Sequence, residues 1–385
     1  MAGGTWRLVA LIAALTIAAR SVNYMVQSTM PLLARELGFG PAAIGLLAAA
    51  MASGQLVGSS LLNVALGPEH RRLAFLGAAA SMPLLLLSLS LSGADALWPL
   101  AFLSGLAFGV VMPNLINLAS LRREDAERLL AVYSLSLSVS LVVGPAYESA
   151  VLAQYDYRDV FLFFLPLAVI LAALSARTAV PGGGPGGGLG AAYKAALTSR
   201  GLAVAVSAIT AYNVPFMALV NYLPIYAGEE LGLVRSAAYS LFLPFFAASM
   251  ATRLYMSIRP VRDVVRAFSA SVALTLVGLA LLAASRTYWL LALSVVLLGV
   301  PHGSVYTLSI ISIARTTRLE LRNSVNSLFS SYLVLLGAAA PPMLGLAAEA
   351  WGYGAMWLAS LVPSAASAGA FLALSARSKE LRGLT

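Results

Sequence analysis

Residues 96–120 read ALWPLAFLSGLAFGVVMPNLINLAS, a run of 25 residues in which no side chain carries a charge. A helix on a soluble protein needs only one apolar stripe, whereas a helix in lipid is apolar all round and satisfies its own backbone hydrogen bonds. At about 1.5 Å per residue, about 20 residues cross a hydrocarbon core of about 30 Å. This run is therefore long enough to span a membrane.

Similar apolar stretches fill the rest of the chain. The composition agrees, because 60% of the residues are hydrophobic and 10% are charged, against about 25% charged residues in soluble domains. The first stretch is too long for a cleaved signal peptide and contains Arg20. We therefore predict an all-α multi-pass membrane protein of twelve transmembrane helices, near 6–30, 42–66, 72–92, 96–120, 128–152, 158–178, 201–227, 236–258, 266–285, 288–313, 322–347 and 354–376.

The basic residues fall on alternate connections between these spans. With a cytoplasmic N-terminus, 19 of the 24 Lys and Arg residues lie in inner segments, four lie in outer segments, and Arg20 lies within a span. This bias follows the positive-inside rule, so we expect a plasma-membrane protein with both termini in the cytoplasm. The net charge of +9 is spread over short loops. Anionic lipid is its expected neighbour, and no nucleic acid is expected to bind.

Several classes of chemistry are excluded by composition. The chain has no cysteine and two histidines, which excludes disulfides, thiolate metal sites and cysteine catalysis, and no metal-ligand spacing occurs. Glycines at 182, 184 and 187 match a dinucleotide-binding pattern, but a membrane helix and not a strand precedes them. That segment is interpreted as a flexible linker. We expect no cofactor, no metal and no enzymatic activity.

The linker divides the chain into two sets of six helices that resemble each other. The expected domains are residues 1–178 and 199–385, joined by a Gly/Pro-rich cytoplasmic linker at 179–198. A parallel repeat of two six-helix bundles is a transporter architecture, with its site between the bundles near mid-membrane. The repeated positions are Gly105 and Gly109 with Gly299 and Gly303, and Gly144-Pro145 with Ala340-Pro341.

With these motifs in place, nearly the whole chain resembles the major facilitator superfamily. The resemblance implies two pseudo-symmetric bundles and alternating access. The signature loop after the second helix has an asparagine where the family has aspartate, and it keeps the arginines. The matching positions are Gly105, Gly109 and Pro113 in helix four, Gly144 and Pro145 of the helix-five motif common in antiporters, and Asn63, Arg71 and Arg72 in the loop.

One polar face of the first span contains the deepest charge. A charge in hydrocarbon costs several kcal/mol, so each one is a candidate functional group. Arg20 is either a cationic anchor, because guanidinium binds carboxylate in a bidentate fork, or a structural arginine bonded to helix ends or Glu148. The face repeats at helical spacing through Thr16, Arg20, Asn23, Tyr24 and Gln27.

Other polar residues within the spans are weaker candidates. Glu148 is either a proton-coupling carboxylate or an interfacial residue exposed to an outer vestibule. His302, with Tyr306 one turn on, either binds substrate and relays protons or only packs. Arg253 resembles a cavity-lining arginine of anion-carrying family members, but it could also snorkel to the inner surface. Four asparagines either line the pathway or join helices: Asn114, Asn117, Asn213 and Asn221.

Three functions remain open on this basis. The leading expectation is a secondary active transporter, a symporter or antiporter, that moves a small anionic organic or inorganic solute with Glu148 or His302 as the proton-coupling group. Gly144-Pro145 favours the alternative of a proton-coupled antiporter that exports drug-like compounds. A membrane-embedded enzyme or non-transporting receptor is the alternative of another class. The expected partners are a small-molecule substrate and membrane lipid, and the protein is expected to be a monomer.

Overall fold

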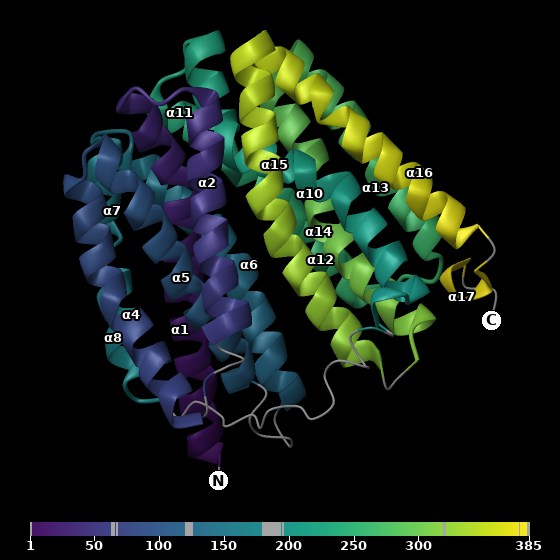
Figure 1. Cartoon of the computed structure of the whole chain (residues 1–385), viewed down its shortest axis with the longest axis horizontal. Coiled ribbons are helices and arrows are strands. Elements are labelled where there is room, and N and C mark those ends of the chain that lie inside the picture. Colours follow the sequence, from purple (N-terminus) through teal and green to yellow (C-terminus); the bar gives the residue numbers. More distant parts are fainter. Residues whose placement is uncertain are drawn as a thin grey trace. The chain divides into compact units, whose positions relative to one another are not determined.

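The computed structural model describes residues 2–62, 66, 68–119, 126–178, 194, 196–318, 321–376 and 378–382. Within these residues all regular structure is helical and no strand occurs. The glycine run of the linker and the motif residue Asn63 lie outside them. Figure 1 traces the chain.

Eight helical elements come from the first half of the sequence. Pro166 lies in the first turn of α8, where a helix tolerates proline. Because proline has no backbone N–H, it cannot donate a hydrogen bond that would continue the preceding helix α7. The elements are α1 (Ala2–Glu36), α2 (Pro41–Leu56), the π-helical turn η1 (Val57–Leu62), α4 (Pro68–Leu91), α5 (Ala94–Ala119), α6 (Ala126–Val151), α7 (Tyr157–Phe163) and α8 (Leu165–Ser175).

The second half supplies eight more elements. Side-chain caps begin three of its helices, from Ser199, Asp263 and Thr287. The elements are α10 (Arg200–Leu231), α11 (Arg235–Ser240), α12 (Phe242–Ile258), α13 (Val264–Ala284), α14 (Tyr288–Thr316), α15 (Arg322–Ala359), α16 (Leu361–Ser375) and α17 (Lys379–Arg382).

These elements account for the predicted spans. Ten runs among the described residues are long and apolar enough to cross a membrane. One of them, Ser324–Ser375, contains two predicted helices, because the backbone at Gly352 leaves the helical region (φ 82°, ψ 166°). Dividing that run at Gly352 and adding α6, which is not among the ten, gives the twelve helices predicted. The all-α membrane fold is confirmed.

The described chain forms two compact units. Unit 1 comprises Met1–Phe39, Leu46–Pro185 and Arg235–Ser240, and unit 2 comprises Gly40–Gly45, Gly186–Val234 and Leu241–Thr385. Compared with a division of the sequence at 179–198, two short segments change places. The helix α11 packs on α6 within unit 1, and the first turn of α2 packs within unit 2.

Close helix packing within each unit depends on glycine. A Cβ added to Gly105 of α5 would lie 1.8 Å from the carbonyl oxygen of Met51 in α2, so only hydrogen fits there. Small residues let two backbones approach in this way. The repeated pair in unit 2 approaches α12 in the same manner, so the sequence repeat is a repeat of helix contacts. An added Cβ would also lie 2.0–2.5 Å from a backbone carbonyl oxygen at Gly54, Gly58, Gly109, Gly299 and Gly303.

Candidate functional site

The polar residues predicted to share a face of α1 lie within unit 1. Thr16, Asn23 and Tyr24 are buried, whereas Arg20 and Gln27 are partly exposed. Arg20 Nη1 donates a hydrogen bond to Asn23 Oδ1 at 3.1 Å, one helical turn further along. This hydrogen bond orients the guanidinium relative to its own helix.

Glu148 lies in an enclosed cluster formed by α1, α6 and α11. Its side chain is 0% exposed, so it does not face an open vestibule. Thr29 Oγ1 donates to one carboxyl oxygen of Glu148, and Tyr239 Oη makes a 2.5 Å hydrogen bond with the other. Tyr239 Oη also lies 2.6 Å from Ser28 Oγ, and Tyr24 lies close to both Tyr239 and Glu148. We call these five residues the Glu148 cluster.

The sequence singled out Glu148 and Tyr24 but not the other members of the cluster. Ser28 lies one helical turn beyond Tyr24, and Thr29 follows it, so an extension of the polar face would have found both. Tyr239 lies 91 positions from Glu148 in the chain. No spacing in the sequence links these two residues.

Surface contacts hold α11 in place on unit 1. Arg235 at its start forms an ion pair with Asp156 and lies 3.5 Å from Glu36 Oε2, and its guanidinium lies 4.9 Å above the ring of Tyr157. Ser149 Oγ donates to the carbonyl oxygen of Ser236 at 3.0 Å. Exposed ion pairs contribute little individually, so the buried contact at Tyr239 carries more of the attachment.

The first turn of α2 is held within unit 2 by a second glutamate. Glu349 Oε2 accepts a hydrogen bond from the backbone N–H of Ala42 at 3.0 Å. Tyr222 Oη lies 3.1 Å from the carbonyl oxygen of Pro41 and 2.9 Å from that of Pro341. A carboxylate at a helix N-terminus satisfies an unpaired backbone donor and interacts favourably with the helix dipole. Neither Glu349 nor Tyr222 was predicted from the sequence.

Unit 2 contains a partly buried cation in α12. Arg253 has Tyr212 and Tyr306 as its electrostatic neighbours. Across the described residues, no hydrogen bond or ion pair from a protein group reaches its guanidinium. Tyr306 is about half exposed, at 48%. The arrangement is a cation beside two aromatic side chains.

His302 lies in an aromatic cluster in the same unit. Its ring stacks on Phe216, with centroids 4.4 Å apart, and on Phe245 at 5.0 Å. Phe246 meets it edge-on at 5.5 Å, and Tyr212 lies 5.9 Å away. Tyr212 thus contacts both the histidine cluster and the surroundings of Arg253. The sequence did not indicate these aromatic neighbours, because they come from two other helices, α10 and α12.

Two of the four predicted asparagines bond to the backbone of their own helix. The side chains of Asn114 and Asn221 each donate to the backbone carbonyl four positions earlier, at 2.8 Å in both cases. Each bond satisfies one N–H of the amide within its own helix. Asn213 is buried and Asn117 is exposed.

The motif residues lie in unit 1. Gly144 and Pro145 are buried in α6, where a Cβ at Gly144 would make an ordinary contact with Ser21 of α1 at 3.7 Å. Arg71 Nη2 donates to the carbonyl oxygen of Leu66 at 3.0 Å, whereas Arg72 is exposed. Asn63 lies outside the described residues.

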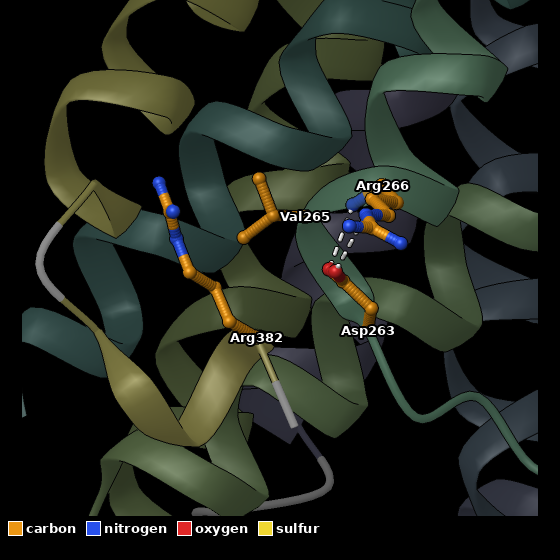
Figure 2. A pocket seen from close by; sticks show the side chains of 4 residues that line it. All are labelled: Asp263, Val265, Arg266 and Arg382. Carbon is orange, nitrogen blue, oxygen red and sulfur yellow. Dashed lines mark hydrogen bonds and ion pairs between the residues drawn. The ribbon is translucent and has the colours of Figure 1, made fainter. Parts of the chain in front are cut away.

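A pocket at the start of α13 contains none of the predicted site residues. Figure 2 shows Asp263 bonded to Arg266, with Val265 and Arg382 of α17 completing the lining. Asp263 accepts from the backbone N–H of Arg266 at 2.9 Å and thereby caps α13. Arg266 is 91% exposed, so this is a surface feature of a helix end. Among the described residues, no group of three or more His, Asp or Glu could hold a metal ion.

Comparisons with known proteins agree with this architecture. The family model described as Major Facilitator Superfamily matches residues 10–341. A bacterial homolog of the human lysosomal transporter Spinster, in an inward-facing and unoccupied conformation, is 11% identical; the match covers 98% of each chain with a TM-score of 0.75. The nucleoside transporter NupG is 14% identical, over 95% of this chain and 98% of its own, with a TM-score of 0.74.

A further similar structure is a POT family transporter in complex with a thioalcohol-conjugated peptide. It is 11% identical, the match covers 97% of this chain and 96% of that one, and the TM-score is 0.73. At such identities the similarity establishes the fold alone. A search of curated proteins gives no match.

Proposed function

This chain belongs to the Major Facilitator Superfamily, and on that premise we propose that it moves a small anionic solute by alternating access, coupled to protons. It is a multi-pass secondary transporter of a small molecule, not an enzyme. We propose further that it acts as a monomer in the plasma membrane, with both termini in the cytoplasm. The basic inner loops support this orientation.

The surroundings of Arg253 are the single observation on which the proposal of an anionic substrate depends. A guanidinium withdrawn from water is costly unless a counter-charge accompanies it. Its described surroundings supply two tyrosines and no carboxylate contact. An incoming carboxylate or phosphate would supply that charge through two parallel hydrogen bonds. Arg20, oriented by Asn23, is the second anchor in the proposal.

Glu148 is the proposed proton carrier. Its carboxyl is fully buried and touches hydroxyl groups, which both donate and accept hydrogen bonds. Such partners accommodate the neutral and the ionised form of the carboxyl in turn. His302 is the second candidate, because histidine titrates near physiological pH.

A second candidate function is favoured by the aromatic cluster. The rings of Phe216 and Phe245 around His302 would suit a planar, drug-like compound through stacking. With Gly144-Pro145, this observation supports a proton-coupled antiporter that exports such compounds. The first candidate binds an anion through a guanidinium, whereas the second binds an aromatic compound through ring stacking.

A ligand screen on purified protein tests the proposal. Ligands that bind the folded state raise its unfolding temperature, so we expect a panel of small carboxylates and phosphates to do so. Arg253→Ala should weaken the binding of a carboxylate by about 1.5–3 kcal/mol, the value of a hydrogen bond to a charged group. Arg253→Lys keeps the charge, loses the fork and should bind with intermediate affinity.

Arg259→Ala is the matched control, because Arg259 is an exposed arginine at the end of the same helix. It should bind the carboxylate as the parent does. Unchanged affinity in Arg253→Ala would show that this arginine only snorkels to the inner surface. Stabilisation by aromatic cations alone would favour the exporter.

A further inference from the structure

We propose that the substrate carries both a flat aromatic ring, which lies against Phe216 and His302, and an acidic group, which binds Arg253. This rests on the proposed function, because it names the class of anion that Arg253 takes. The aromatic cluster and the cation are parts of one site, since α10, α12 and α14 of unit 2 form both.

Three rings of the aromatic cluster lie nearly parallel to one another. The planes of Phe216 and His302 are inclined by 22°, those of Phe245 and His302 by 29°, and those of Phe216 and Phe245 by 9°. Phe245 is fully buried, whereas Phe216 and His302 are partly exposed. A flat ring that reaches the two exposed rings stacks in the same orientation, and offset stacking is a favoured geometry for aromatic pairs.

The helices α12 and α14 run side by side in the same direction. Gly299 of α14 faces the backbone of Phe245, and Gly303, one turn on, faces that of Ser249. Each step of four residues along one helix is therefore matched by a step of four along the other. The next such step from Ser249 reaches Arg253.

The cation is offset from the rings by one helical turn. Tyr306, an electrostatic neighbour of Arg253, lies one turn beyond His302 on α14. Tyr212, the other neighbour of Arg253, lies one turn from Phe216 on α10. A turn rises about 5.4 Å, so a short spacer should separate the ring of the substrate from its acidic group.

Tyr212 joins the aromatic and the cationic parts of this site. Its ring lies 5.9 Å from that of His302 and 6.2 Å from that of Phe216, and Arg253 is its electrostatic neighbour. Its hydroxyl is buried and has no hydrogen-bond partner among the described residues. A buried hydroxyl without a partner costs free energy, and a carboxylate at Arg253 would remove that cost by accepting its hydrogen bond.

The two parts together restrict the ligand more than either does alone. A positively charged aromatic compound would be repelled by Arg253, and a small inorganic anion would not contact the rings. An aromatic acid with a short spacer contacts the guanidinium, the Tyr212 hydroxyl and the exposed faces of the rings at once.

Four small probes test this class of substrate. The compound 3-phenylpropionate has the ring, a two-carbon spacer and the acid. In 3-cyclohexylpropionate the ring is not aromatic, propionate lacks the ring, and 3-phenylpropanol lacks the charge. Affinity is measured on the purified transporter in detergent, as the rise in unfolding temperature with probe concentration.

The parent protein should prefer the aromatic acid. We expect 3-phenylpropionate to bind about two- to tenfold more tightly than 3-cyclohexylpropionate, as stacking adds to burial. The cyclohexyl compound is the more apolar of the two, so partition into detergent would favour it and cannot produce this preference. The comparison needs no variant, so it does not depend on how a substituted protein folds.

Two substitutions assign the preference to the ring and the binding to the hydroxyl. Phe216→Leu should make the two acids bind equally, whereas Phe102→Leu, an exposed phenylalanine of α5, should keep the parent preference. Tyr212→Phe keeps the ring and should weaken both acids about tenfold, with 3-phenylpropanol unchanged. Its matched control is Tyr255→Phe, an exposed tyrosine of α12, which should bind every probe as the parent does.

Equal affinity of the parent for the two acids, or a preference that survives in Phe216→Leu, would overturn the proposal of an aromatic acid. Carboxylates would then still bind through Arg253, and the anionic substrate would stand. If none of the acids binds, or if Arg253→Ala binds them as the parent does, both proposals fail.

Discussion

Glu148 shows how a buried acid can be held without an opposite charge in direct contact. Its described hydrogen-bond partners are Thr29 and Tyr239, both hydroxyls. A guanidinium in contact would hold the carboxyl in its charged form, whereas a hydroxyl reverses its hydrogen bond when the proton leaves. This chemistry suits a residue that must change its protonation state in each cycle.

Transport kinetics should separate the proton from the substrate at this residue. In Glu148→Gln, uphill uptake driven by a pH gradient should be lost, because the amide cannot carry the proton. Exchange of substrate at equal pH should persist, since exchange moves no net proton. Both are measured as tracer flux in proteoliposomes with a substrate found in the ligand screen.

The control is Glu230→Gln, which neutralises an exposed glutamate at the end of α10. Its uphill uptake should match the parent. Uphill uptake that survives in Glu148→Gln would transfer the coupling role to His302.

The sequence indicated the charged residues of the candidate site but not their partners. Arg20, Glu148 and Arg253 stand out because a charge within an apolar span costs free energy and is therefore a candidate functional group. Their neighbours depend on which helices meet. Nothing in the sequence distinguishes Tyr239 from other tyrosines, because its role depends on the packing of α11 on α6. The aromatic residues around His302 are likewise common in membrane helices.

At the scale of elements, glycine sets how closely helices pack. The predicted span 96–120 is α5, and the predicted span 266–285 is α13, because length and apolar character decide both. The π-helical turn η1 was not predicted. It adds a residue per turn at Val57–Leu62, and its Gly58 would meet the carbonyl oxygen of Leu106 at 2.4 Å if it had a Cβ. The spacing of four between such glycines indicates close helix packing, but it does not indicate which helix is the partner.

Gly105→Ala should therefore destabilise the contact between α2 and α5. The added methyl would lie 1.8 Å from a backbone oxygen, so a helix must move. We expect a loss of about 1–3 kcal/mol, as for other overpacked sites. The measurement is thermal unfolding in detergent.

The matched control is Gly77→Ala in α4, where a new Cβ meets nothing within 4 Å. That variant should be as stable as the parent or slightly more stable, because alanine favours helix over glycine by about 1 kcal/mol. Equal unfolding temperatures for the two variants would contradict the packing argument.

For the whole molecule, topology in the membrane follows from loop charge. Single cysteines at Gly93 and Arg286 should react with an impermeant maleimide from outside, and one at Thr198 should not. All three positions are exposed, so accessibility does not bias the comparison. Labelling of position 198 in sealed cells, without labelling of 93 and 286, would reverse the orientation.

The sequence did not predict the two short segments that join the other unit, 40–45 and 235–240. A linker rich in glycine divides the chain at 179–198 and makes two sets of six helices the natural expectation. Which unit the segments 40–45 and 235–240 join depends on contacts made by Glu349 and Tyr239 with distant helices. Loop composition gives no information about those contacts.

The placement of α11 also determines the order in which the protein can mature. A ribosome releases the chain from its N-terminus, so Glu148 enters the bilayer long before Tyr239 has been made. Unit 1 gains its last segment, Arg235–Ser240, only after α10 has been translated. A nascent chain arrested in the glycine-rich linker would carry an acid whose tyrosine partner does not yet exist. Completion of the first bundle is therefore a late event in biogenesis, and the second half of the message must be read to achieve it.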